Sequence, residues 1–477
     1  MESGITLPPR LPRDVLHRIF SLCAPTYQLV GRGWRRRPDN EARDVLAHSH
    51  LGQLALVCRF WRFVALTPDL WSTIEVDFET RLRRTSFAAL LTRCVERSGT
   101  VPLTLHVRAR YPTEECMVQL IFLARESDRW RVANIETVEE RGGEGWLSTI
   151  SKFSLLETLH IRPYPTRIQI TDVQAPRLTR VAAWNTFKPY LRLPWAQLET
   201  VYLRHIATRS LAEVLKSFRP FSAFYGGALH LAIDNCDIDP SGRIPTFCAP
   251  LGELHITLRE WCSQPPHTNA VLSRALSSLR LPRLHTLQLF SACEVNECDT
   301  QLVLSHAAFL NFVEVSLLGD TLTTLSLVDV GIPESKLPEC LAALPALTHL
   351  TLSDLVDLGH IIITDNILRR LAVRLPGNTC TLLPRLTHFT CYTLLSFDDD
   401  ALRDFVAARV RNTPATGSPT FTLTVNVFVR RGARRKFGLP FCRFISAHQE
   451  TGELACKAQY VPRAVDRDVE NAWASVQ

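Results

Sequence analysis

A short apolar pattern recurs between residues 155 and 391, and it constrains the fold more than any other feature. Its core is L-x-x-L-x-L, often preceded by Pro or a small residue, as in LLETLHI at 155–161, LGELHITL at 251–258 and PALTHLTL at 345–352. Two apolar residues two positions apart share one face of a β-strand, and the leucine three positions earlier anchors the turn before it. We therefore expect stacked strands in a parallel sheet, with helices or loops on its other side.

The remaining copies of the pattern follow the same design. They are PRLTRVAAW at 176–184, AQLETVYL at 196–203, GALHLAI at 227–233, PRLHTLQL at 282–289, DTLTTLSL at 320–327 and PRLTHFTC at 384–391. The pattern resembles the strand of a leucine-rich repeat, which implies a leucine-rich-repeat-like solenoid over residues 147–445.

The spacing of the anchor leucines makes this solenoid irregular. Leu156, Leu178 and Leu198 are 22 and 20 residues apart, whereas later anchors are 25 to 39 residues apart, so the later repeats contain inserted helices or loops. Asn235 and Asp329 stand where a repeat asparagine is expected. The alternative is a set of ordinary α/β units that do not stack as a solenoid.

Amphipathic segments between the strands predict helices on the convex side. They are Ser210–Phe218, Thr300–Phe312, Leu337–Leu344 and Asp398–Val410. The alternating segment at 421–429 predicts a closing strand. From Ser446 the sequence is polar, and we assign residues 446–477 to a loosely held C-terminal tail.

The N-terminal region has a different pattern, centred on the run LGQLALVCRFWRFVALTPDLW at 51–71. On one helix its apolar residues would cover nearly the whole circumference, so that helix would have to be buried on all sides. Residues 11–23 predict an upstream amphipathic helix, and Thr67-Pro68-Asp69 is a helix-start signal. So small a unit buries only part of its surface by itself. We therefore expect the rest of the chain or a second protein to cover the remainder.

The succession LPRDVLHRIF, LALVCRFWRFVA and TPDLWSTIEV resembles the F-box, in the divergent form of many fungal F-box proteins. The resemblance covers residues 7–76, with a polar, Arg-rich insertion at about 26–49. It implies docking on a Skp-family adaptor and, through it, on a cullin-based ubiquitin ligase. The adaptor contacts that it implies are Leu11, Pro12, Val15, Ile19, Phe20, Val57, Trp61, Leu70 and Trp71. For Trp61 and Trp71 the alternative is packing in the core of the module itself.

Residues 77–146 predict a linking segment that caps the first repeat. We expect a helix over Phe87–Val95, a strand over Pro102–Val107 and a second helix over Glu114–Arg129. On the second helix, the residues expected to face inward are Cys116, Leu120, Ile121 and Leu123. The predicted fold class is therefore α/β: a small N-terminal helical module followed by an irregular solenoid with a parallel sheet.

The composition is that of a globular protein, with 46% hydrophobic and 21% charged residues and a net charge of +7. The N-terminus has no secretory signal pattern and the chain has no apolar run long enough to span a membrane. The Cys residues, scattered through apolar segments, indicate buried side chains in a reducing compartment. We therefore expect a cytoplasmic or nuclear location. Only six residues are Lys, which fits biased genomic composition or a chain that works near ubiquitin transfer.

The sequence contains no phosphate-binding loop, nucleophile elbow or zinc-protease helix, so we expect a protein that is not an enzyme and has no cofactor. His160, His230, His255, His285, His349 and His388 lie in the strand pattern, where we expect half-exposed or satisfied positions. Cys293 and Cys298 lack a second ligand pair, so we expect no metal there. The Arg-rich segments at 32–38 and 430–436 are expected to be solvated loops rather than nucleic-acid sites.

These observations favour a substrate-recognition subunit of a Skp-cullin-F-box ligase, with an unknown protein substrate on the concave strand face. Its candidate contact residues are Glu157, His160, Arg180, Tyr202, Gln288, Ser326, Thr351 and Thr390. The alternative is a leucine-rich-repeat scaffold with no ligase role. A third class, an enzyme, would need a clustered polar pocket that the sequence does not reveal.

Overall fold

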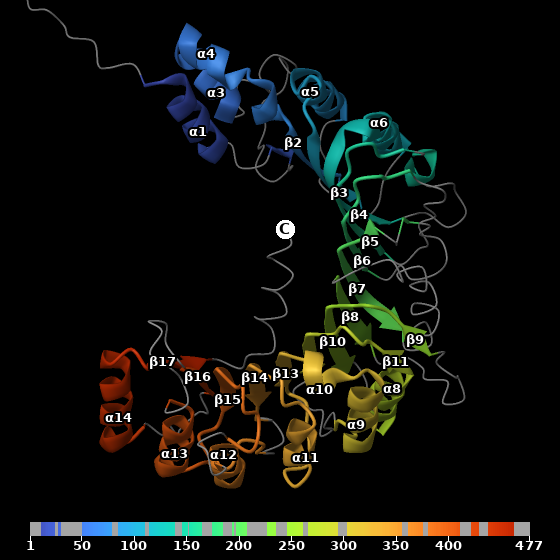
Figure 1. Ribbon diagram of the computed structural model, residues 1–477. Helices are drawn as coiled ribbons and strands as arrows, with labels where there is room; N and C mark the ends of the chain where they lie inside the picture. The colour runs from blue at the N-terminus through green and yellow to red at the C-terminus, as the bar shows by residue number, and fades with distance from the viewer. Residues whose placement is uncertain are drawn as a thin grey trace, which may run out of the picture. The chain divides into compact units, whose positions relative to one another are not determined.

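The computed structural model describes residues 11–23, 27–29, 50–78, 84–109, 114–138, 146–150, 152–164, 174–184, 193–194, 197–207, 227–234, 246–260, 266–293, 303–354, 361–374, 380–410, 421–428 and 437–461. The chain divides into two compact units, Met1–Pro194 and Trp195–Gln477. Both contain parallel strands with helices on one face (Figure 1).

The first unit begins with helices and continues as a parallel sheet. Its elements are α1 (Arg13–Cys23), β1 (Tyr27–Leu29), α3 (His50–Val57), α4 (Arg59–Ala65), the 3-10 helix η1 (Pro68–Trp71), β2 (Thr73–Asp77), α5 (Arg84–Arg97), β3 (Leu103–Ala109), α6 (Glu114–Arg125), η2 (Ser127–Arg129), β4 (Trp130–Val138), η3 (Trp146–Thr149), β5 (Thr158–Tyr164) and β6 (Arg180–Trp184). Its strands pair in the order β1-β2-β3-β4-β5-β6, and every pair is parallel.

The second unit alternates strands and helices. Its elements are β7 (Thr200–Ala207), β8 (Ala228–Asp234), β9 (Phe247–Cys248), β10 (Glu253–Glu260), α8 (Pro266–Ser278), β11 (Leu279–Arg280), β12 (Thr286–Cys293), α9 (His306–Val315), α10 (Leu318–Thr321), β13 (Thr324–Val328), α11 (Leu337–Ala342), β14 (His349–Ser353), α12 (Asp365–Ala372), β15 (His388–Thr393), α13 (Asp399–Val410), β16 (Phe421–Phe428), α14 (Leu439–Glu450) and β17 (Leu454–Val461). The main sheet runs β7-β8-β10-β12-β13-β14-β15-β16-β17, and β9 and β11 form a separate parallel pair.

The predicted fold class is confirmed, because each copy of the apolar pattern ends in a strand of a parallel sheet. The inward residues stack in register across neighbouring strands, as Leu287, Leu325 and Leu350 do. These three are at most 1% exposed, and the anchors Leu322 and Leu347 are fully buried. Stacking the repeats therefore removes a continuous row of leucine side chains from water, which is the main source of stability in such an array.

Threonine hydroxyls join successive repeats at the start of the strands. Thr323 Oγ1 donates to His285 O (3.1 Å), Thr348 Oγ1 to Thr323 O (3.0 Å) and Thr387 Oγ1 to Thr348 O (3.2 Å). Each hydroxyl thus bonds a carbonyl of the preceding repeat at the point where the chain enters its strand. The recurrent Thr after the anchor leucine has a structural role for this reason.

Asp354, directly after β14, also joins successive repeats through hydrogen bonds, and it occupies the place of a repeat asparagine. Its carboxylate accepts hydrogen bonds from the backbone N–H groups of Ile362 and Ile363 (2.8 and 2.9 Å). It also accepts from Thr393 Oγ1 (2.8 Å) and the N–H of Leu394 (3.1 Å). One fully buried carboxylate therefore ties three segments together. Of the two residues expected at repeat-asparagine positions, Asp329 accepts a hydrogen bond from Ser353 Oγ, and Asn235 lies outside the described residues.

The linking segment joins the sheet of the first unit. Helix α5 ends at Arg97 and is followed by Gly99, whose backbone has φ +55°. Strand β3 pairs with both β2 and β4. Helix α6 buries Leu120 and Leu123, but Ile121 is 36% exposed. The expectation that Ile121 faces inward was wrong, since a position one residue after Leu120 is rotated by about 100° around the helix.

The C-terminal region differs from the expected loose tail. Residues 446–450 complete α14, which buries Phe441 and Ile445, and β17 pairs with β16 along its whole length. Strand β16 therefore does not close the sheet. The polar residues of β17 are compatible with a strand because they lie on its open face, where Gln459 Nε2 donates to Asn426 Oδ1 (2.7 Å).

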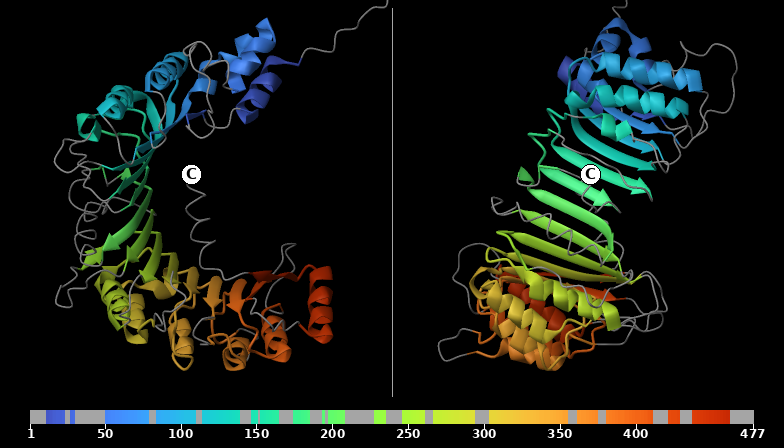
Figure 2. Two further views of the ribbon diagram at one scale, coloured as in Figure 1. Left: turned by 180° about the vertical axis from the view of Figure 1, so that it is seen from behind. Right: turned by 90° about the vertical axis from the view of Figure 1, so that its right-hand side faces the viewer.

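The predicted helices after residue 300 are present as α9, α11 and α13, whereas Ser210–Phe218 lies outside the described residues. Helices α8 and α12 were not anticipated. They occupy the long intervals between anchor leucines, as the irregular spacing required. The helices of the second unit cover one face of its sheet, and the other face stays open (Figure 2).

The cysteines only partly follow the expectation of buried side chains. Cys94, Cys340 and Cys391 are buried, and burial raises the pKa of the Cys94 and Cys340 thiols to about 12 and about 11. Cys58 and Cys248 are exposed. The thiols of the first group are therefore protonated and unreactive at neutral pH.

Candidate functional site

The apolar run at 51–71 does not form one helix. Helix α3 ends at Val57, and Cys58 has an extended backbone (φ −160°, ψ 171°) that begins α4. The Cys58 Sγ accepts a hydrogen bond from the N–H of Trp61 at 3.4 Å and caps the new helix. A chain that breaks here distributes its apolar residues over two short helices. The expectation of one helix buried on all sides was therefore wrong.

A small core holds α1, α4 and η1 together. Phe20 of α1 is fully buried and meets Trp61 edge to face, with ring centroids 5.3 Å apart. Trp71 is 1% exposed, and its Nε1 donates to Ala65 O at 2.8 Å. The Arg97 guanidinium of α5 lies 4.4 Å from the Trp71 ring centroid, which connects η1 to α5.

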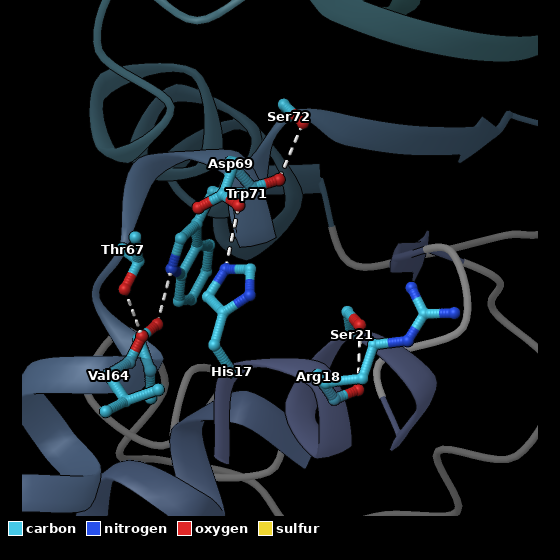
Figure 3. Close-up of polar contacts among 9 residues, drawn as sticks. His17, Arg18, Ser21, Val64, Thr67, Asp69, Trp71 and Ser72 are labelled. Atoms are coloured by element: carbon cyan, nitrogen blue, oxygen red, sulfur yellow. Dashed lines mark hydrogen bonds and ion pairs between the residues drawn. The ribbon is translucent and has the colours of Figure 1, made fainter. Parts of the chain in front are cut away.

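Polar contacts fix the turn that follows α4 (Figure 3). Thr67 Oγ1 donates to Val64 O (2.6 Å) and Ser72 Oγ to Asp69 O (2.6 Å). His17 Nε2 of α1 lies 2.7 Å from Asp69 Oδ2 of η1. The helix start predicted at Thr67-Pro68-Asp69 is confirmed, with Thr67 at the N-cap position and Pro68 in the first turn.

The same helices expose a group of large apolar side chains, which we call the apolar ledge. On α1 and just before it these are Leu11 (47% exposed), Val15 (39%), Ile19 (37%) and Leu22 (68%). On α3 and α4 and at the caps beside them they are Leu56 (72%), Val57 (60%), Phe60 (37%), Phe63 (57%) and Leu66 (39%). The Arg13 guanidinium lies over the Phe63 ring at 4.8 Å and joins the two groups.

The structure separates the predicted contact residues into two sets. Leu11, Pro12, Val15, Ile19 and Val57 are exposed. Phe20, Leu70 and Trp71 are buried, and Trp61 is half-buried against Phe20. The buried three pack inside the helical module in this conformation. The assignment of all nine residues as adaptor contacts stays a prediction.

Sequence reasoning missed Leu22, Leu56, Phe60, Phe63 and Leu66. All were visible as apolar residues, and Phe60 and Phe63 of α4 have the i, i+3 spacing of one helical face. Their neighbours Leu51, Val64 and Ala65 are equally apolar but buried. Hydrophobicity alone does not separate these two sets, since the separation depends on which side of each helix meets α1 and the sheet.

The residues proposed for substrate recognition lie on the open face of the strands, except Glu157, which directly precedes β5. Gln288 on β12, Thr351 on β14 and Thr390 on β15 are half-buried. Ser326 and Tyr202 are 7% exposed, and the Tyr202 ring stacks on His230 with centroids 4.0 Å apart. In the first unit, Glu157 and Arg180 are exposed, whereas His160 is only 7% exposed.

The strand histidines mostly occupy half-buried or exposed positions, as expected. His160 departs from this, and burial lowers the pKa of its imidazole from 6.5 to about 4. Burial also lowers the pKa of His230, whose ring lies between Tyr202 and His255. These imidazoles are therefore neutral at pH 7.

Other predicted features fall partly outside the described residues. Cys298 and the Arg-rich segments at 32–38 and 430–436 are among them, and so is most of the insertion at 26–49. The described part of that insertion includes β1, which pairs with β2. Within the described ranges, no group of three or more His, Cys, Asp or Glu side chains is arranged to hold a metal ion. In the same ranges, none of the helices has both the length and the hydropathy needed to traverse a bilayer.

The N-terminal helices lie in a part of the sequence that matches a known domain family. Residues 8–76 match the F-box-like family model. This range contains α1, α3, α4, η1 and all of β2 but its last residue, and so the whole apolar ledge. No curated protein matches the chain.

Proposed function

We propose that this protein is the substrate-recognition subunit of a Skp-cullin-F-box ubiquitin ligase. In this proposal the F-box-like region at 8–76, of the divergent fungal type, docks on a Skp-family adaptor and through it on a cullin. The stacked strands form a leucine-rich-repeat-like domain whose open face binds the target protein. The protein has no catalytic role of its own and acts in the cytoplasm or nucleus.

The apolar ledge is the observation that carries the proposal. Its members, from Leu11 to Leu66, are all more than a third exposed, and they lie on α1, α3 and α4 or at the ends of these helices. A group of exposed apolar side chains on neighbouring helices supports a protein-interaction site, because its exposure to water is unfavourable. The ledge lies inside the F-box-like match, and F-box domains generally bind Skp-family adaptors. The low Lys content is compatible with a position near ubiquitin transfer.

A co-expression experiment with a Skp-family adaptor tests the proposal. The variant Val15→Glu with Ile19→Glu puts two carboxylates on the exposed side of α1 and leaves the buried Leu16 and Phe20 unchanged. We expect loss of adaptor co-purification with an unchanged circular dichroism spectrum, because an unpaired charge is costly to bury in an interface. The matched control is Val118→Glu on α6, where Val118 is 61% exposed and outside the F-box-like match.

The control variant should keep the adaptor. If the wild-type chain fails to bind the adaptor, or if the double variant binds it as well as the wild type does, the proposal is refuted. Failure of the wild-type chain would favour the alternative of an interaction scaffold without a ligase role.

A further inference from the structure

The open face of the second unit carries a patch without formal charge. We define the neutral face as the outward-facing residues of β12, β13, β14, β15 and β16, from Thr286 to Phe428. Toward the ends of two of these strands Ser353, Asn426 and Phe428 are buried, so the accessible part lies nearer the strand starts. In these described strands, no outward-facing residue is Asp, Glu, Lys or Arg. Hydroxyl groups predominate, contributed by Thr286, Thr324, Thr351, Thr390, Thr422 and Thr424.

The boundaries of the neutral face are charged. Glu253 lies on β10 in register with Thr286, and Lys457 lies on β17 in register with Thr424. A third charge lies at the end of β13, where the Asp329 carboxylate accepts a hydrogen bond from Ser353 Oγ. The sheet of the first unit, in contrast, carries charged side chains. There Arg108 Nη1 lies 3.4 Å from Asp77 Oδ2, and Arg108 Nε lies 3.2 Å from Glu136 Oε2. An uncharged patch is therefore a local property of these five strands and not of the protein's strand faces in general.

Two stacked imidazoles lie on the neutral face. His349 and His388 are in register on β14 and β15, with ring centroids 4.0 Å apart and ring planes 12° apart. Burial lowers the pKa of both imidazoles from 6.5, and for His349 the neighbouring His388 adds to the shift. Both rings are therefore neutral at pH 7, and the patch has no charge under these conditions.

The hydrogen bonds around the two rings determine their tautomer. Thr348 Oγ1 donates its single proton to Thr323 O, so it must accept from His349 Nδ1, which lies 2.8 Å away. Thr387 Oγ1 likewise donates to Thr348 O and accepts from His388 Nδ1 at 2.9 Å. Each neutral ring thus has its proton on Nδ1 and a bare lone pair on Nε2. The stack offers two parallel hydrogen-bond acceptors.

We propose that the neutral face binds an uncharged, extended segment of the target protein, rich in Asn, Gln, Ser or Thr, whose N–H or O–H groups donate to Nε2 of His349 and His388. The surrounding threonine hydroxyls accept and donate further hydrogen bonds. A charged side chain would lose its hydration here without meeting an opposite charge, so charged segments are disfavoured. This inference rests on the proposed function, since it names the class of target segment.

The dimensions set the length of the segment. Five parallel strands about 4.8 Å apart span about 19 Å, which an extended peptide of about six residues crosses. Suitable probes are fluorescein-labelled peptides of about ten residues that alternate Gly with Asn and Ser, with Asp, or with Lys. Binding to the full chain is measured by fluorescence polarisation at pH 7.5.

The expected result is that the Asn/Ser peptide binds at least about tenfold more tightly than either charged peptide. The variant His349→Phe with His388→Phe keeps two stacked rings but removes both acceptors. It should weaken this binding about tenfold, the effect of losing two hydrogen bonds of ordinary strength. The matched control is His306→Phe on α9, on the helix-covered side, and it should bind as the wild type does.

Several outcomes would overturn the inference. One is that a charged peptide binds as tightly as the Asn/Ser peptide or more tightly. Another is that the His349→Phe/His388→Phe variant binds the Asn/Ser peptide as well as the wild type does. A third is that a neutral oligosaccharide binds more tightly than any of the peptides. Adaptor co-purification is measured on the same variants. If the adaptor is retained and the neutral peptide does not bind, the inference fails and the proposed function stands. If the peptide binds and the adaptor does not, the proposed function fails.

Discussion

Truncating the exposed side chains of Leu56 on α3 and Phe63 on α4 should weaken adaptor binding without unfolding the chain. Leu56 is 72% exposed and Phe63 57% exposed, so these fractions of each side chain remain to be buried by a partner. Complete burial of a Leu or Phe side chain is worth about 2.5 kcal/mol, so the exposed parts contribute up to about 1.8 and about 1.4 kcal/mol. Together they correspond to an affinity loss of up to about two hundredfold for Leu56→Ala with Phe63→Ala.

Isothermal titration calorimetry of the purified chain with a Skp-family adaptor measures this loss. The free energy of unfolding should change little, because both side chains already face water. We expect a decrease of about 0.5–1 kcal/mol from the lost contact between Arg13 and the Phe63 ring. Val118→Ala on α6 removes an equally exposed side chain elsewhere and should leave the affinity unchanged. An unaltered affinity in the double variant would show that the apolar ledge is not the adaptor surface.

Three further predictions concern stability. Asp354→Asn should lower the free energy of unfolding by about 3 kcal/mol in urea titrations, since an amide cannot accept all four hydrogen bonds; a loss below about 1 kcal/mol would contradict the role of this carboxylate. Trp71→Phe should lower the free energy of unfolding by about 1–3 kcal/mol, because Ala65 O loses the hydrogen bond from Trp71 Nε1. An unchanged free energy of unfolding in the same titration would contradict this role of Trp71. Burial lowers the pKa of His160 to about 4 in the folded chain, so the imidazole is protonated at a higher pH in the unfolded chain than in the folded one. The free energy of unfolding should therefore decrease by up to about 3 kcal/mol as the pH falls from 6.5 to 4. His160→Gln should flatten this dependence, and an identical pH profile would refute the assignment.

The strands were predictable because their signal is local. A period of two, an anchor leucine and a preceding turn occur within eight residues, so the pattern is recognisable without any long-range contact. The helix start at Thr67-Pro68-Asp69 was readable for the same reason. Strand β17 was missed because its open face carries Lys457 and Gln459, and pairing with β16 outweighs its low apolar content.

The N-terminal helices show where sequence reasoning reached its limit. The amino-acid order determined that residues 11–71 hold more apolar side chains than a small helical unit can bury, and that a parallel sheet follows. It did not determine the break at Cys58, because apolar residues continue on both sides of it. Only the tertiary structure decided that Phe20 and Trp71 are buried while Phe63 and Leu56 face water. Burial is a property of which surfaces meet, and residues of equal hydrophobicity differ in it only through their neighbours in space.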